Sequence, residues 1–214
     1  MRYNTVLFDL DGTLTDPAEG IVNSVLYALN KVGIIERNRE KLLKFIGPPL
    51  TESFSDYYGF SSAEAVRAVD DYREYYSDKG IFQNQLYPGI PELLTTLKNN
   101  GKTIALATSK PEVYAKQILK HFDIDAYFDF VGGCLLDGTR VKKGDVIRYT
   151  CQALKISKPD AVIMVGDREH DVLGAKANGL PCIGVLFGYG SREELENAGA
   201  SFLVSTVKEL GSIL

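Results

Sequence analysis

Two carboxylates that stand two residues apart near the start of the chain are the clearest sign of chemistry in the sequence. An apolar run at residues 6–8 leads into Asp9 and Asp11, and Gly12 follows. Such a run predicts a strand, and glycine marks the turn that ends it. Because residues two apart on a strand share a face, both acids can meet one substrate. An ordinary strand with an acidic turn is the alternative, but leaving a sheet needs only one polar residue.

Three further pairs of polar residues follow other apolar runs. They are Thr108 with Ser109, Lys142 with Lys143, and Asp167 with Asp171. We expect the hydroxyls of the first pair at a helix N-terminus, where unpaired backbone amides suit a phosphate, and a lysine of the second pair can neutralise it. Each pair alone is also typical of a helix cap or of a solvated surface. Beside the acid pair, all three favour one ligand site.

The elements that must position these residues are short apolar strands alternating with helices. Strand-like runs cover residues 6–8, 103–107, 128–131, 161–165 and 182–185, and helical patterns cover 112–121, 144–154 and 171–178. This alternation predicts an α/β fold in which helices cover both faces of a parallel sheet. Ligands in such folds bind at the carboxyl ends of the strands, which is where the polar pairs stand.

The segment between residues 16 and 87 interrupts the alternation, because it is helical in pattern and contains no convincing strand. An amphipathic stripe runs from Ile21 to Val32 and ends at Gly33, and further helices are predicted at 40–45, 50–58 and 62–77. A structureless loop of this length would be unusual inside a compact domain. We therefore predict an α-helical cap at residues 16–87, inserted into a core formed by residues 1–15 and 88–214.

Composition narrows the classes of partner. The 214 residues are 45% hydrophobic and 24% charged, with a net charge of −4 and no basic cluster, so we expect no nucleic-acid polymer as a partner. No apolar run approaches the roughly 20 residues that cross a bilayer, so we expect no membrane association. The three cysteines form no Cys-x-x-Cys pair, which is typical of reduced thiols in a cytoplasmic protein. Both a monomer and a weak homodimer are compatible with the sequence.

Taken together, these motifs resemble the haloacid dehalogenase superfamily across essentially the whole chain. The matching motifs, in the family's order, are Asp9-Leu10-Asp11-Gly12-Thr13, Thr108, Lys143, and Gly166-Asp167 with Asp171. The resemblance is closest to phosphatases with a small helical cap, in the phosphoglycolate phosphatase and 5′-nucleotidase-like branch. It implies a Rossmann-like three-layer core with a helical cap. The chain has Lys142-Lys143-Gly144 where the family often has Lys-Pro, and the spacing to the next helix favours Lys143.

The resemblance also implies roles for these residues. Asp9 would attack phosphorus and form an aspartyl-phosphate, and Asp11 would carry protons to the leaving group and from water. Lys143 would neutralise charge, while Thr108, Ser109 and the amides near Gly12 would bind phosphoryl oxygens. Asp9, the backbone carbonyl of Asp11, and Asp167 would hold Mg²⁺, with Asp171 acting through water or orienting the others. The substrate would be a small phosphate monoester.

Other activities of the same superfamily remain as alternatives. Sugar-phosphate mutases of the β-phosphoglucomutase type use the same nucleophile, but their best-known members carry a cap histidine. Both histidines of this chain, His121 and His170, lie outside the predicted cap, which favours hydrolysis. A dehalogenase is disfavoured by Asp11. Phosphonate hydrolysis would use a cap lysine, for which Lys31, Lys41 and Lys44 are available, but exposed lysines are common and this activity is disfavoured. A non-catalytic binding or regulatory protein would be expected to have lost an essential acid or lysine, and none is missing.

Overall fold

The computed structural model describes residues 3–137 and 139–214, which fall into two units. One unit contains Met1–Asp16 and Leu86–Leu214, and the other contains Pro17–Gln85. This division falls one residue after the first predicted boundary and two residues before the second. The chain passes between the units at β2 (Thr15–Asp16) and β3 (Gln85–Leu86), which pair as a two-stranded sheet.

The first unit is built on a six-stranded parallel sheet. Its strands are β1 (Thr5–Phe8), β4 (Thr103–Pro111), β5 (Phe130–Cys134), β6 (Val162–Gly166), β7 (Cys182–Val185) and β8 (Phe202–Val204). They lie in the order β5-β4-β1-β6-β7-β8, and every pairing in the sheet is parallel. Phe8 pairs with Leu106 of β4 on one side and with Val165 of β6 on the other. The predicted α/β fold with a parallel sheet is therefore confirmed.

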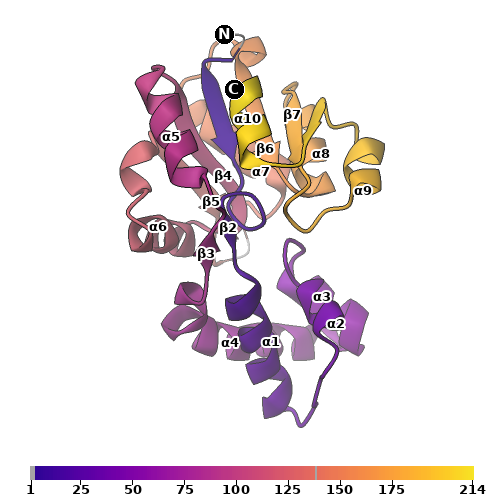
Figure 1. The fold of residues 1–214 in the computed structure, drawn as a ribbon. Coiled ribbons are helices and arrows are strands. Elements are labelled where there is room, and N and C mark those ends of the chain that lie inside the picture. The colour runs from indigo at the N-terminus through magenta and orange to yellow at the C-terminus, as the bar shows by residue number, and fades with distance from the viewer. Residues whose placement is uncertain (1–2, 138) are drawn as a thin grey trace. The chain divides into compact units, whose positions relative to one another are not determined.

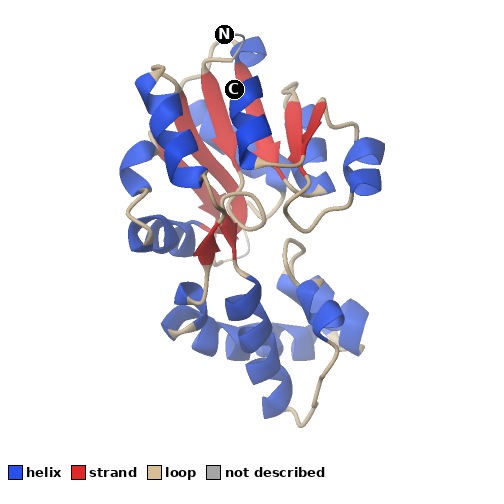
Figure 2. Ribbon diagram, in the orientation of Figure 1, coloured by secondary structure: helices blue, strands red, loops and turns tan. Residues whose placement is uncertain are grey.

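Helices cover both faces of this sheet, as Figures 1 and 2 show. They are α5 (Ile90–Asn99), α6 (Glu112–His121), α7 (Lys143–Ala153), α8 (Glu169–Ala177), α9 (Arg192–Ala198) and α10 (Val207–Ile213), with short 3₁₀ turns at Asp125–Tyr127 and Pro159–Ala161. Helix α5 packs with α10 on one face, and α7 packs with α8 on the other. Strand residues such as Leu7, Leu106 and Met164 are fully buried as a result. A sheet buried on both faces explains why its strands read as continuous apolar runs.

The sequence missed several elements at the margins of this unit. Strand β5 begins two residues later than predicted, and β4 continues four residues beyond its predicted end at Ala107. Strand β8 and helices α5, α9 and α10 were not predicted. Strand β8 has only three residues, two of them partly exposed, so it lacks the apolar run that marked the central strands.

The second unit is helical. It contains α1 (Ala18–Lys31), α2 (Arg39–Leu43), α3 (Leu50–Tyr58), α4 (Ser62–Asp78) and a 3₁₀ turn at Gly80–Phe82. Helix α4 begins with a capping box, in which Ser61 accepts from the Glu64 amide and the Glu64 carboxylate accepts from the Ser61 amide. Buried aromatic rings fill the core, with Phe45 and Phe54 in edge contact at 5.0 Å between ring centroids. Among the described residues, no helix is long and apolar enough to cross a membrane.

Candidate active site

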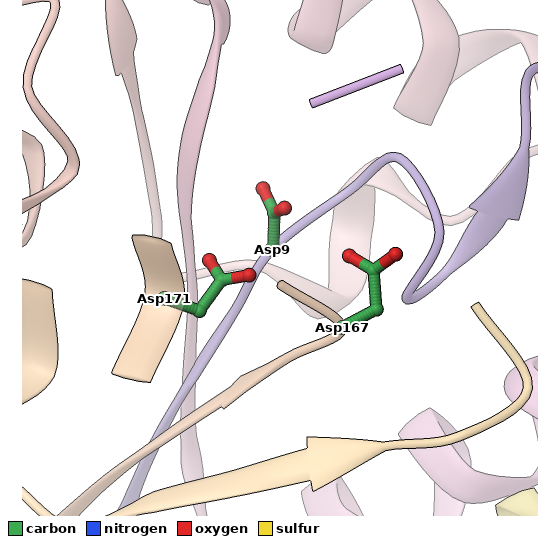
Figure 3. A group of neighbouring side chains, drawn as sticks. All are labelled: Asp9, Asp167 and Asp171. Carbon is green, nitrogen blue, oxygen red and sulfur yellow. The ribbon is translucent and has the colours of Figure 1, made fainter. Parts of the chain in front are cut away.

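Three buried aspartates meet at the carboxyl ends of two adjacent strands. Asp9 follows β1 directly and donates its amide to Val165 of β6 at 2.9 Å. Asp167 follows β6, and Asp171 lies in the first turn of α8. One carboxylate oxygen of each aspartate lies within 4.8 Å of the others, and the three side chains extend into the same region (Figure 3). Strand pairing thus brings together residues that are up to 162 positions apart in the chain.

Lys143 supplies a buried cation to this cluster. Its side chain is 5% exposed, and its ammonium lies 2.8 Å from Asp9 Oδ1 and 2.7 Å from Asp171 Oδ1. The ammonium also donates to the carbonyl of Ala107 at 3.2 Å. Burial by itself would lower the pKa of Lys143, but the charges of Asp171 and Asp9 outweigh it and raise the pKa above its ordinary value. The ammonium therefore stays protonated between the two carboxylates.

Asp167 is held by backbone groups and by close-packed glycines. Its Oδ2 accepts from the Tyr189 amide at 2.8 Å, whereas its buried Oδ1 has no hydrogen-bond partner among the described residues. Burial, followed by the charges of Asp171 and Asp9, raises the pKa of this carboxyl well above its usual value. A Cβ at Gly12, whose φ is +81°, would lie 2.1 Å from Asp167 Oδ2, so only glycine fits there.

Asp171 is as deeply buried as Asp167, since each is 1% exposed, whereas Asp9 is 8% exposed. The amide of Arg168 donates to its Oδ2 at 3.1 Å, which closes the first turn of α8. Burial raises its pKa to about 6, with Lys143 opposing the rise and Asp9 adding to it. Three carboxylates with a single lysine leave an excess of negative charge in a buried place. The charge and burial of the cluster therefore suit a further cation.

Asp11 lies apart from this cluster and has its own lysine. Its Oδ2 is 2.5 Å from the ammonium of Lys110, whose side chain is 6% exposed. Its Oδ1 is buried and has no hydrogen-bond partner among the described residues. Burial raises the pKa of Asp11 and the charge of Lys110 opposes that rise. Sequence reasoning missed Lys110, although it is two residues from Thr108 on a strand and therefore on the same face.

Thr108 and Ser109 lie on strand β4 and not at a helix N-terminus, so that expectation was wrong. Helix α6 begins only at Glu112. Proline disfavours helical backbone in the residue before it, and Pro111 therefore keeps Lys110 extended up to the predicted helix start. Thr108 is 2% exposed, and its hydroxyl accepts from the Lys110 amide at 3.2 Å.

The amide of Gly12, expected to bind phosphate, already has a partner. It donates to the carbonyl of Thr15 at 2.8 Å within the turn that follows Asp11. Gly12 therefore provides space for Asp167 rather than an unpaired donor. The structure also distinguishes the two candidate lysines, because Lys143 is buried in the cluster whereas Lys142 is exposed.

The loop after β7 is a second feature that sequence reasoning missed. It contains Gly188, Tyr189 and Gly190, and a Cβ at Gly188 would lie 2.4 Å from the Cβ of Asp167. The phenol of Tyr189 donates to Asp16, the last residue of β2. The two glycines around a tyrosine, three to five residues after the end of a predicted strand, were the available signal. His170, which lies between Asp167 and Asp171 in the sequence, is exposed.

A family model described as haloacid dehalogenase-like hydrolase matches residues 6–185, a range that includes every candidate site residue. A 5′-nucleotidase of Pseudomonas aeruginosa is 48% identical over 195 residues, which cover 91% of this chain and 88% of that protein. The tyrosine-protein kinase PtkA of Mycobacterium tuberculosis is 39% identical over 212 residues, or 98% of this chain and 72% of that protein. A crystal structure of a predicted phosphatase from Clostridium acetobutylicum has a TM-score of 0.95 and 53% identity, with 100% of this chain and 98% of that one covered.

Proposed function

The chain belongs to the haloacid dehalogenase-like hydrolase family and is a phosphatase, and we propose that it hydrolyses a small phosphate monoester through a phosphorylated Asp9. The observation that carries the proposal is the buried cluster of Asp9, Asp167 and Asp171 with Lys143 in contact with two of them. The cluster combines a nucleophilic carboxylate with the cationic surroundings that a phosphate requires.

The donor set of the cluster fits a divalent metal ion. All its side-chain donors are carboxylate oxygens, which Mg²⁺ prefers, and Asp167 Oδ1 is a buried acceptor without a partner. Asp9, Asp167 and the backbone carbonyl of Asp11 would hold the ion, and Asp171 would orient the set from its place beside Lys143. The ion would neutralise the charge of the phosphate and of the nucleophile, which otherwise repel each other.

Asp9 would act as the nucleophile. An oxygen of its carboxylate attacks phosphorus as the bond from phosphorus to the leaving oxygen breaks, and an aspartyl-phosphate forms. Lys143 is within 2.8 Å of Asp9 Oδ1, so it orients the attacking group and balances its charge. Thr108 and Ser109, on the neighbouring strand β4, are the proposed donors to the phosphoryl oxygens.

Asp11 would move the protons. In the first step its carboxyl protonates the leaving oxygen, and in the second it takes a proton from the water that attacks the aspartyl-phosphate. A carboxyl whose pKa is raised by burial suits this role better than an exposed one. Separate roles as nucleophile and proton carrier account for the presence of both Asp9 and Asp11 at the end of β1.

The substrate class is the finer part of the proposal. The similarity to a 5′-nucleotidase supports a nucleoside monophosphate, while the predicted branch also contains phosphoglycolate phosphatases. Hydrolysis is favoured over mutase chemistry because the unit Pro17–Gln85 contains no histidine. We place the substrate among small phosphorylated metabolites, with water as the acceptor.

A substrate panel with matched variants tests this function. The wild-type protein should release inorganic phosphate from para-nitrophenyl phosphate and from at least one of AMP, UMP or phosphoglycolate, and EDTA should stop the release. Asp9→Asn should abolish turnover, whereas Asp56→Asn, a change in the helical unit, should leave it intact. Phosphate release that persists in Asp9→Asn would contradict the assignment of Asp9 as the nucleophile. Interconversion of glucose 1-phosphate and glucose 6-phosphate in place of phosphate release would identify a mutase. Failure to release phosphate from any compound would favour a binding protein.

A further inference from the structure

The site contains two buried lysines, and each is in contact with different acids. Lys143 contacts Asp9 and Asp171, whereas Lys110 contacts Asp11. Lys143 therefore has a clear place in the proposed chemistry, since it supports the nucleophile. Lys110 has no role there, although its side chain is almost as deeply buried. A buried ion pair is costly to desolvate and is weak evidence for a purely stabilising role.

The backbone around Lys110 is built to hold it at this place. Strand β4 continues past its last regular pairs with β5, and the register shifts between Ala107 and Pro111. A Cβ on Gly133 of β5 would lie 2.7 Å from the carbonyl oxygen of Lys110, so the close approach of the two strands requires glycine there. Pro111 favours extended backbone at Lys110, and the Lys110 amide donates to Thr108 Oγ1 at 3.2 Å. The backbone of Lys110 is thus held in place, and its ammonium contacts Asp11 from there.

The contact with Lys110 makes the two oxygens of the Asp11 carboxyl inequivalent. Lys110 Nζ lies 2.5 Å from Oδ2, while Oδ1 is buried and has no hydrogen-bond partner among the described residues. An ammonium has three donors and no acceptor, so a proton on Oδ2 would face a donor. The proton that Asp11 transfers is therefore directed to Oδ1. A carboxyl with one oxygen held this way also has fewer rotamers available to it.

From this geometry we propose that Lys110 is a positioning residue for Asp11, the proton carrier. Its ammonium binds Oδ2 of Asp11 so that Oδ1 faces the leaving group. The inference rests on the proposed phosphatase function. In the first step the Asp9 oxygen bonds to phosphorus, the bond to the leaving oxygen breaks, and the proton on Asp11 Oδ1 moves to that oxygen. Lys110 keeps all its protons throughout. In the second step Oδ1 takes a proton from water as the water oxygen bonds to phosphorus and the bond from phosphorus to the Asp9 oxygen breaks, which releases inorganic phosphate and restores the starting state.

This role makes the effect of Lys110 depend on the leaving group. An alkoxide is strongly basic and needs a proton as it departs, whereas a nitrophenolate leaves without one. A residue that acts only through Asp11 should therefore matter for alkyl phosphates and hardly at all for nitrophenyl phosphates. A lysine that bound the phosphoryl group itself would matter equally for both.

The test compares kcat/KM for two substrates in four proteins. The substrates are para-nitrophenyl phosphate and whichever of AMP, UMP and phosphoglycolate the wild type hydrolyses fastest. The proteins are the wild type, Lys110→Met, Lys110→Arg and the control Lys116→Met, whose exposed lysine pairs with Glu112 on α6. We expect Lys110→Met to lose about 10²-fold on the alkyl phosphate, the lower end of what general acid catalysis contributes, and less than about threefold on the nitrophenyl ester. Lys110→Arg should recover part of the loss, and Lys116→Met should match the wild type.

Acid-quenched phosphoenzyme gives a second readout. Because Asp11 also activates the water, Lys110→Met should accumulate more phosphorylated Asp9 than the wild type during turnover of the nitrophenyl ester. Equal losses on both substrates, or no loss on either, would overturn the positioning role of Lys110. If Lys110→Met does not fold, Lys110→Gln carries the same comparison. A wild type that hydrolyses neither substrate would instead overturn the phosphatase function itself.

Discussion

Replacing Lys143 with methionine should destabilise the sheet-containing unit strongly, because the change removes the cation from a buried cluster of acids. The methionine is close in length, so packing is nearly preserved. The side chains of Asp9 and Asp171 are only 12% and 1% exposed, and both would be left without their counter-charge. Breaking a buried pair by removing one partner costs about 3–5 kcal/mol. In a chain of this size that corresponds to a drop in Tm of about 6–20 °C.

Urea unfolding followed by circular dichroism, in EDTA, measures this loss. At about pH 8 Asp171 is ionised in the wild type, since its pKa is about 6, and the full cost should appear. At about pH 5 Asp171 takes up a proton in the variant, so the cost should shrink. The control is Lys142→Met, which alters the exposed neighbour and should stay within about 0.5 kcal/mol of the wild type. If Lys143→Met were as stable as the wild type at about pH 8, the lysine would not be balancing a buried cluster, and the electrostatic account would be refuted.

Three further predictions concern the glycine turn, the pH dependence of stability and the helical unit. Gly12→Ala places a Cβ 2.1 Å from Asp167 Oδ2 and should lower kcat about 10²-fold in a phosphate-release assay, while Gly179→Ala, which shares a positive φ but has nothing within 4 Å, should keep its activity. In EDTA, the folded Asp171 carboxyl holds its proton more tightly than the unfolded one, so its contribution to the free energy of unfolding should fall by up to about 3 kcal/mol as pH rises from about 4 to 6. The urea midpoints of the wild type and Asp171→Asn at several pH values isolate this contribution, and equal slopes would contradict it. Phe54→Ala removes a fully buried ring from the helical unit and should cost about 3–5 kcal/mol, seen as faster proteolysis within residues 17–85, whereas Val66→Ala at an exposed position should not change the cleavage rate.

The central strands and the acids that follow them could be predicted because burial on both faces leaves a continuous apolar signal. The runs that became β1, β6 and β7 were found within one residue of their observed bounds, and helix α3 was found at Leu50–Tyr58. A parallel sheet then brings the carboxyl ends of all its strands to one edge, and the observed strand order makes β1 and β6 neighbours there. The approximate location of Asp9 and Asp167 follows from the sequence for this reason.

The finer geometry of the site could not be predicted because it depends on side-chain partners and on local backbone. Lys110 and Asp11 are 99 residues apart, and nothing in the spacing says which lysine meets which acid. Thr108 was expected at a helix N-terminus because Thr and Ser favour that position, but β4 continues through Pro111 and α6 begins at Glu112, the start that the sequence predicted. The edge strand β8 was missed because two of its three residues are partly exposed.

The measurement that tests the central claim most directly is mass spectrometry of the protein quenched in acid during turnover with Mg²⁺ and para-nitrophenyl phosphate. A peptide that contains Asp9 should carry one phosphoryl group, hydroxylamine should remove it, and the peptide from Asp9→Asn should carry none. Phosphate release at the normal rate with Asp9 unmodified, in wild type and under a quench fast enough to resolve the first turnover, would contradict covalent catalysis by Asp9.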